Sequence, residues 1–268
     1  MAINCLLNEE DNDNTMRYSY SRLIALTTFL SLLVGWPAYG QMMLKGTSEA
    51  GRRLFHSSAI SNNGLSCGHC HADFDESKRS DGLIRAAHSL YNSYYRETWW
   101  GKDPEDPDAY ASIDEASLVC VVHYMRNKTK LTAQQLLDLK AYLKSLSFKL
   151  VRRAQPIAPA ADLTGEYPVY AGGNRFEGKE VFYAACHSCH PNGNAGIAPK
   201  PIPRDQDFSY YAKYIREGDG LGAVLSGVDP NAYQYKDGRF MPFFGADRLS
   251  NEQISDIIAY IKSLPPSP

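Results

Sequence analysis

One five-residue pattern occurs twice in this 268-residue chain: two cysteines separated by two residues, followed directly by a histidine. The copies are Cys67–His71 (CGHCH) and Cys186–His190 (CHSCH). Downstream of them, Leu131–Leu146 aligns without gaps with Leu249–Leu264, and eight of the sixteen aligned positions are identical. The distance from the motif histidine to this segment is 60 residues in the first copy and 59 in the second. The chain is therefore an internal duplication.

The two aligned segments carry the signals of helices. Thr132 with Gln135 and Ser250 with Gln253 each form a capping box, which satisfies the free amides at a helix start. Apolar residues then recur at helical spacing. A second helical pattern opens before each motif, at 51–55 and at 178–182. We therefore expect an all-α fold, with these apolar positions in its core: Leu136, Leu139, Leu143 and Leu146 in the first half, and Ile254, Ile257, Ile261 and Leu264 in the second.

The repeated motif is a signal for covalent attachment of haem. Two thiols one helical turn apart can bond to the two vinyl groups of a porphyrin, and the histidine is then placed as the proximal ligand of the iron. A zinc or redox site is the alternative, and it suits a cytosolic chain without the following histidine. We expect two covalently bound haem c groups, attached at Cys67, Cys70, Cys186 and Cys189, with iron ligands His71 and His190.

The first 40 residues have the features of a secretory signal peptide. Arg17 and Arg22 form a basic region, an uncharged run follows over 23–34, and small residues end it at 38–40. The run is shorter than the roughly 20 residues of a membrane-spanning helix, so membrane attachment is expected only if the signal stays uncleaved. Residues 1–15 are acidic and polar, and we expect translation to begin at Met16. These features predict export to the periplasm.

The remaining chain divides into two predicted domains. The segment 151–169 is rich in proline and alanine and reads as a semi-rigid linker. It separates a first domain at 41–150 from a second at 170–268. Outside residues 1–40, basic and acidic side chains balance at 26 each, which gives no indication of nucleic-acid binding.

Each half resembles a class I cytochrome c, in which an N-terminal helix, the haem motif, a distal loop and a C-terminal helix follow in this order. The resemblance implies two tandem all-α domains, each wrapping one haem. The segment 239–245 (RFMPFFG) is similar to the Met-Pro loop that supplies the distal ligand in that class. Met241 is therefore expected to bind the second haem iron, and its thioether would favour the reduced state.

The first haem has three candidate distal ligands within six residues: Cys120, His123 and Met125. Cys120 is favoured because it is the unpaired cysteine of an exported chain, and ligation would protect its thiol from oxidation. The segment also resembles the cysteine-ligated haem domain of thiosulfate dehydrogenases and related sulfur-oxidation cytochromes. Met125 and His123 remain open, as does a Cys120 that merely packs in the core.

The leading functional interpretation is electron transfer between redox protein partners. The alternative is a thiosulfate dehydrogenase-like enzyme that oxidises a small sulfur anion at a cysteine-ligated haem, with Cys120 as its catalytic residue. On that interpretation Arg126 and Lys128 would attract the anion. Five aromatic residues, Tyr91, Tyr94, Tyr95, Trp99 and Trp100, are expected to line the first haem pocket.

Overall fold

The computed structural model describes residues 44–97, 99, 110, 112–152, 157–198, 200–229, 231–232 and 241–266. From Met43 onward the chain forms one compact unit, while the predicted signal peptide and Met16 lie outside the described residues. The described segments are helices, turns and one isolated bridge between Trp99 and Tyr110, which confirms the all-α prediction. Within these segments no helix is both long enough and apolar enough to cross a bilayer.

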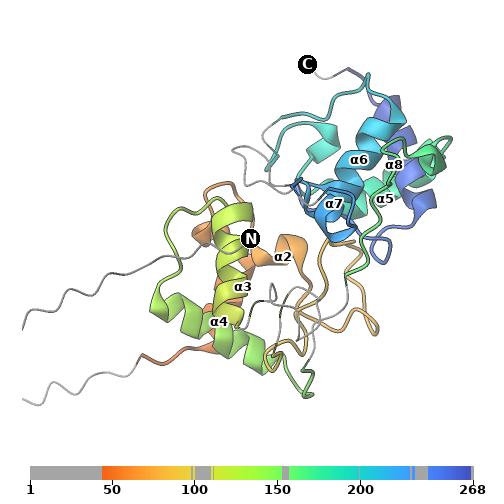
Figure 1. Cartoon of the computed structure of the whole chain (residues 1–268). Helices are drawn as coiled ribbons and strands as arrows, with labels where there is room; N and C mark the ends of the chain where they lie inside the picture. Colours follow the sequence, from red (N-terminus) through yellow and green to blue (C-terminus); the bar gives the residue numbers. More distant parts are fainter. Residues whose placement is uncertain are drawn as a thin grey trace, which may run out of the picture. The chain divides into compact units, whose positions relative to one another are not determined.

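In the described residues, each half of the chain holds six helical elements. Figure 1 shows how the longer helices are arranged. The first half holds α1 (Ser48–His56), η1 (Ser58–Ile60), α2 (Cys67–Cys70), α3 (Ile113–Val119), η2 (Cys120–Tyr124) and α4 (Ala133–Ser145). The second half holds η3 (Pro168–Tyr170), α5 (Arg175–Ala185), η4 (Pro191–Gly193), α6 (Phe208–Glu217), α7 (Leu221–Leu225) and α8 (Asn251–Ser263). Both predicted capping boxes are present, at the starts of α4 and α8.

The same helix crossing is built twice, α1 against α4 and α5 against α8. At each crossing a glycine lets two backbones meet. A Cβ at Gly51 would lie 2.0 Å from the carbonyl oxygen of Asp138, and one at Gly178 would lie 1.8 Å from that of Asp256. Atoms cannot approach so closely, so any larger residue would push the helices apart.

At each crossing a buried aspartate binds the backbone at the start of the partner helix. Asp138 accepts a hydrogen bond from the backbone N–H of Thr47 at 2.7 Å, and Asp256 accepts one from Asn174 at 2.6 Å. Thr47 and Asn174 are the N-cap residues of α1 and α5. Because these aspartates occupy matching positions of the aligned segments, the duplication extends to the contacts that orient the helices.

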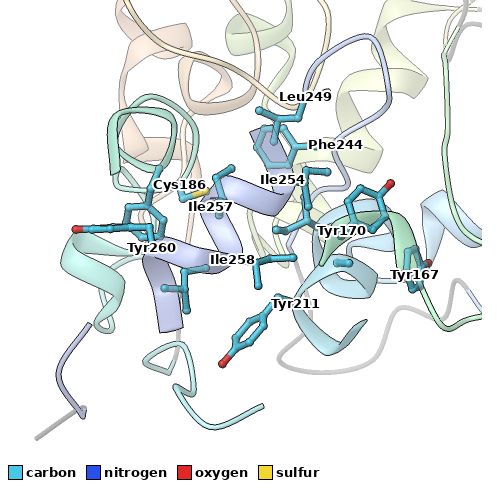
Figure 2. Close-up of a cluster of buried hydrophobic side chains, with 14 residues drawn as sticks. Tyr167, Tyr170, Cys186, Tyr211, Phe244, Leu249, Ile254, Ile257, Ile258 and Tyr260 are labelled. Atoms are coloured by element: carbon cyan, nitrogen blue, oxygen red, sulfur yellow. The ribbon is translucent and has the colours of Figure 1, made fainter. Parts of the chain in front are cut away.

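Each crossing carries its own apolar cluster. Seven of the eight residues expected in the core from the helical spacing lie in these clusters or pack against them. The eighth, Leu143, is also buried. Figure 2 shows the second cluster, which gathers around α8 and includes Cys186 of the second haem motif. The buried residues of the first cluster are Phe55, Ile60, Leu65, Val121, Met125, Leu131, Leu139 and Tyr142.

The described part of the predicted linker packs on the second half. The N–H of Ala246 donates to the carbonyl oxygen of Ala158 at 2.8 Å, and the N–H of Ala161 donates to the hydroxyl of Ser226. Tyr167 is completely buried in the second cluster. The segment 157–167 is therefore held at Ala158, Ala161 and Tyr167, while Leu163 is exposed. The domain boundaries at 150 and 170 stay predictions.

Candidate haem sites

A cavity of about 230 Å³ lies beside the first Cys-x-x-Cys-His motif. Cys67, Cys70 and His71 form part of its wall, and most of the remaining wall is apolar. The cysteines lie on α2, a single helical turn, and His71 follows as its C-cap residue. The motif thus presents both thiols and the imidazole to one apolar space.

The histidine expected as proximal ligand of this site is oriented by the backbone. Nδ1 of His71 donates to the carbonyl oxygen of His88 at 2.7 Å, which leaves Nε2 as the nitrogen with a free lone pair. Burial lowers the pKa of the His71 ring to about 4, so the imidazole is neutral at physiological pH. A neutral, oriented imidazole is the form that binds iron.

Two of the three candidate distal ligands line the same cavity. Cys120 opens η2, a π-helical turn, and Met125 directly follows it, with an N–H that bonds the Cys120 carbonyl at 2.9 Å. Both residues line the cavity, whereas His123 is not one of its lining residues. The π-helical turn thus brings both sulfur atoms, and not the imidazole, to the cavity that holds His71.

Burial favours the protonated form of the thiols in the first site. Burial raises the pKa of Cys120 to about 12, with a further contribution from Cys67. Burial likewise raises the pKa of Cys67 and Cys70 to about 12. A metal ion that binds such a thiol displaces its proton, so ligation by Cys120 would place a thiolate in an apolar cavity.

Two unsatisfied hydrogen-bond donors in this wall fit the carboxylates of a haem. Nε of Arg96 and Nε1 of Trp99 are buried and find no hydrogen-bond partner among the described residues. Burial also lowers the pKa of Arg96 to about 10. Buried donors without partners are rare in folded proteins, and an acidic group at this position would satisfy both. Trp99 lies in the wall as expected, Tyr91, Tyr94 and Tyr95 do not line it, and Trp100 lies outside the described residues.

The second motif follows α5 and shows the same kind of unsatisfied groups. Cys186 is the C-cap residue of α5, and its carbonyl accepts the N–H of His190 at 2.8 Å. Nδ1 of His190 is buried without a partner among the described residues, as are Nε and Nη1 of Arg204. Burial, together with the charge of Arg204, lowers the pKa of His190 to about 4. This donor set also fits a haem and its carboxylates.

Met241 is held by the turn after α6. Its side chain packs against the second cluster, which also contains Cys186. Its carbonyl accepts the N–H of Asp219 at 3.0 Å, and the N–H of Phe244 bonds the carbonyl of Ile215 at 2.8 Å. Arg239 and Phe240, the first residues of the predicted loop, lie outside the described residues.

The cations around the first cavity are not the ones expected from the sequence. Arg126 and Lys128 are absent from the described residues that line it, and Arg96, Lys140 and Arg248 line it instead. The last two are paired, Lys140 with Asp114 at 2.8 Å and Arg248 with Glu76 at 2.8 Å. These residues come from distant parts of the chain, so no local sequence signal could have identified them.

Paired thiols and a neutral histidine beside an apolar cavity, in an all-α fold, define a haem protein of the cytochrome c type. Comparison with known proteins agrees. The cytochrome c family model matches residues 176–265. Cytochrome c6 of Picosynechococcus sp. (strain ATCC 27264 / PCC 7002 / PR-6) is 38% identical over 86 residues, which is 31% of this chain and 68% of that protein. Cytochrome c6 of Limnospira maxima is 38% identical over 88 residues, covering 31% and 85%.

The chain therefore belongs to the cytochrome c family, the electron-transfer proteins with covalently bound haem c and redox protein partners. Among solved structures, thiosulfate dehydrogenase (TsdBA) from Marichromatium purpuratum aligns with 14% identity and a TM-score of 0.36. That alignment covers 81% of this chain and 45% of the other, so this chain spans less than half of that protein's length.

Proposed function

We propose that this chain is an exported di-haem cytochrome c that transfers electrons between redox partners in the periplasm. The observation that carries the proposal is the duplicated plan. The family match covers only residues 176–265, yet the first half repeats the motif, the glycine crossing and the aspartate contact to the helix cap. The first motif also lies beside a cavity with unsatisfied donors.

The proposal assigns unlike axial ligands to the two irons. The proximal ligands are His71 and His190, and Met241 is the distal ligand of the second haem. Cys120 is the distal ligand of the first, and its place in the cavity wall supports this assignment. Met125 remains the alternative for the same reason, while His123 loses support because it does not line the cavity.

The two attachment motifs are neighbours, which supports electron transfer within the chain. Cys189 and Ile197 pack against the first cluster, and the charge on Cys189 contributes to the raised pKa of Cys70. When bound, each haem supplies a one-electron couple. The protein contributes by setting potential, distance and partner docking.

Counting haems per chain tests the proposal. The mature protein should carry two covalent c-type haems that resist acid–acetone extraction. Replacing both cysteines of one motif by serine should leave one haem, whether the change is at Cys67 and Cys70 or at Cys186 and Cys189. A wild-type protein with one haem would contradict the di-haem architecture.

A second function has one observation in its favour: Cys120 lines a cavity that is also lined by the half-buried cation Arg96. A small sulfur anion could be attracted there, as expected for a thiosulfate dehydrogenase-like enzyme. Thiosulfate should then reduce the wild type within seconds and Cys120→Ser far more slowly. If only a protein partner reduces the wild type, with a rate that falls as salt is added, the carrier function stands.

A further inference from the structure

The largest fully buried side chain in the described part of the protein is a cation, Arg216 on α6. Its guanidinium donates four hydrogen bonds. Two go from Nη1 to main-chain carbonyls, those of Phe244 and Leu249, both at 2.9 Å. Nε donates to the hydroxyl of Tyr170 at 2.8 Å, and Nη2 donates to the side-chain oxygen of Asn251 at 2.8 Å.

Three of these four partners lie on one segment of the chain, and the fourth, Tyr170, belongs to η3. Phe244 and Leu249 lie at either end of the segment between Met241 and α8, and Asn251 is the first residue of α8. Figure 2 shows Tyr170, Phe244 and Leu249 together near the start of that helix. A single planar group therefore ties three points of the segment 244–251 to α6.

Arg216 makes no ion pair in the described part of the chain, and the neighbouring Glu217 accepts a hydrogen bond from Tyr167 and lies 3.9 Å from Lys213. All four acceptors of the guanidinium are neutral oxygens. Burying a charged group is costly, and the four hydrogen bonds offset that cost only while their acceptors stay in place. The guanidinium therefore holds these acceptors together.

We infer that Arg216 is the positioning residue that holds Met241 within bonding distance of the second haem iron; the inference rests on the proposed ligation by Met241. Two backbone bonds fix the start of the same loop, from Asp219 to the Met241 carbonyl and from Phe244 to the Ile215 carbonyl. Arg216 fixes the rest of it. Without the guanidinium, the carbonyls of Phe244 and Leu249 would lose their donors, and the loop would open away from the cluster.

The planar set of donors in arginine, and not only its positive charge, should be required to hold the segment 244–251. A guanidinium presents five N–H donors in one plane, whereas the lysine ammonium is a point charge on a flexible stem. Arg216→Lys keeps the charge but cannot serve two carbonyls and two side-chain oxygens together. Arg216→Met removes both the charge and the planar set of donors while filling much of the volume.

The test is competition for the iron in the ferric holoprotein. Imidazole displaces a distal methionine, and its apparent affinity rises with the fraction of molecules in which that methionine is dissociated. Its binding is followed as loss of the weak near-infrared band of methionine-ligated ferric haem, using the part of the band that disappears in Met241→Ala. Arg216→Met should bind imidazole about tenfold more tightly than wild type, because a set of buried hydrogen bonds is lost.

Arg216→Lys should shift the affinity in the same direction, and the matched control Arg175→Met, at an exposed position on α5, should leave it unchanged. Should Arg216→Met fail to fold, Tyr170→Phe removes one of the four bonds and should still tighten imidazole binding, by about twofold to threefold.

Folded Arg216 variants with wild-type imidazole affinity would overturn the inference, even if their thermal stability falls. A band that survives Met241→Ala overturns the ligand assignment and this inference with it. A band that needs Met241 but ignores Arg216 overturns this inference alone.

Discussion

The two halves share a scaffold and differ at their distal sides. Both use a glycine crossing and an aspartate contact to a helix cap. In the first half the proposed distal segment is a π-helical turn with two sulfur-bearing residues, and in the second it is the segment that begins Met241-Pro242. Where two helices cross with their backbones in contact, few substitutions are tolerated. A loop beside a cofactor can change both its length and the side chain that it presents. The two halves thus share a frame and differ in the segments that would face the two proposed irons.

The two halves also differ in the groups that hydrogen-bond their proposed distal segments. In the first half, neutral asparagines do this: the backbone N–H of Asn62 bonds the Met125 carbonyl at 2.9 Å, and the amide of Asn63 bonds the Tyr124 carbonyl at 2.8 Å. In the second half, the buried cation Arg216 takes this role. A positive charge stabilises the reduced iron and a thiolate stabilises the oxidised iron. With the proposed ligands, the thiolate of Cys120 therefore predicts the lower potential for the first haem, although the cation Arg96 lines the same cavity.

The shared scaffold gives the largest expected effect. Gly51→Ala and Gly178→Ala each place a methyl group within 2.0 Å of a backbone oxygen, so each should lower the free energy of unfolding by about 3 kcal/mol or more. Denaturant unfolding of the holoprotein measures the loss, and Lys179→Ala, an exposed neighbour on α5, should be close to neutral. Tolerance of alanine at one glycine alone would show that the two crossings are not equivalent.

Removal of Met241 should affect the second haem only. Met241→Ala should abolish the near-infrared band and lower the potential of this haem by on the order of 0.1 V, since axial ligands shift haem potentials over a range of about 0.8 V. A redox titration followed by optical spectroscopy measures both changes. An unchanged band would place the distal ligand elsewhere.

Removal of Cys120 should have the opposite sign and act on the first haem. Cys120→Ser should raise the lower of the two potentials, because the thiolate charge that stabilises ferric iron is gone. Met125→Ala is the matched control, since it lines the same cavity, and it should leave the low potential in place. If Met125→Ala instead moves the potential and Cys120→Ser does not, Met125 is the ligand.

The smallest expected effect is a pH dependence confined to the second half. Burial raises the pKa of Asp219 to about 6, above the value of about 3.9 expected for an unfolded chain. The folded protein binds the proton more tightly, so this group's contribution to stability falls as pH rises from about 4 to about 6. Asp219→Asn should therefore stabilise the protein at pH 7 by roughly 1–2 kcal/mol, because part of the gain is offset by burying the amide. Urea unfolding of the wild type and of Asp219→Asn, at pH 7 and at pH 4, measures this gain in stability. An equal gain at the two pH values would contradict the prediction.

Local sequence signals predicted the helices and the motif turns well. The capping boxes at Thr132 and Ser250 and the apolar spacing of α4 and α8 depend on residues within one or two turns of each other. Such signals act before any tertiary contact forms. The all-α fold and the frame around each motif could therefore be derived from sequence.

The polar groups that complete the sites could not be predicted. Arg216 lies in a stretch that reads as an ordinary amphipathic helix, and its partners are 28 to 46 residues away. Arg96 is an isolated arginine in an aromatic stretch, while the expected cations Arg126 and Lys128 do not line the cavity. Burial of a charge is decided by tertiary packing, and a single sequence carries no record of it.

Low-temperature electron paramagnetic resonance of the fully oxidised protein tests the central claim most directly, because thiolate, bis-histidine and histidine–methionine haems give distinct low-spin signals. Two signals of equal intensity are expected. One is a rhombic thiolate signal that disappears in Cys120→Ser, and the other is a histidine–methionine signal that disappears in Met241→Ala. A single kind of signal, or two that both survive in Cys120→Ser, would contradict the claim that one duplicated scaffold holds two unlike haems.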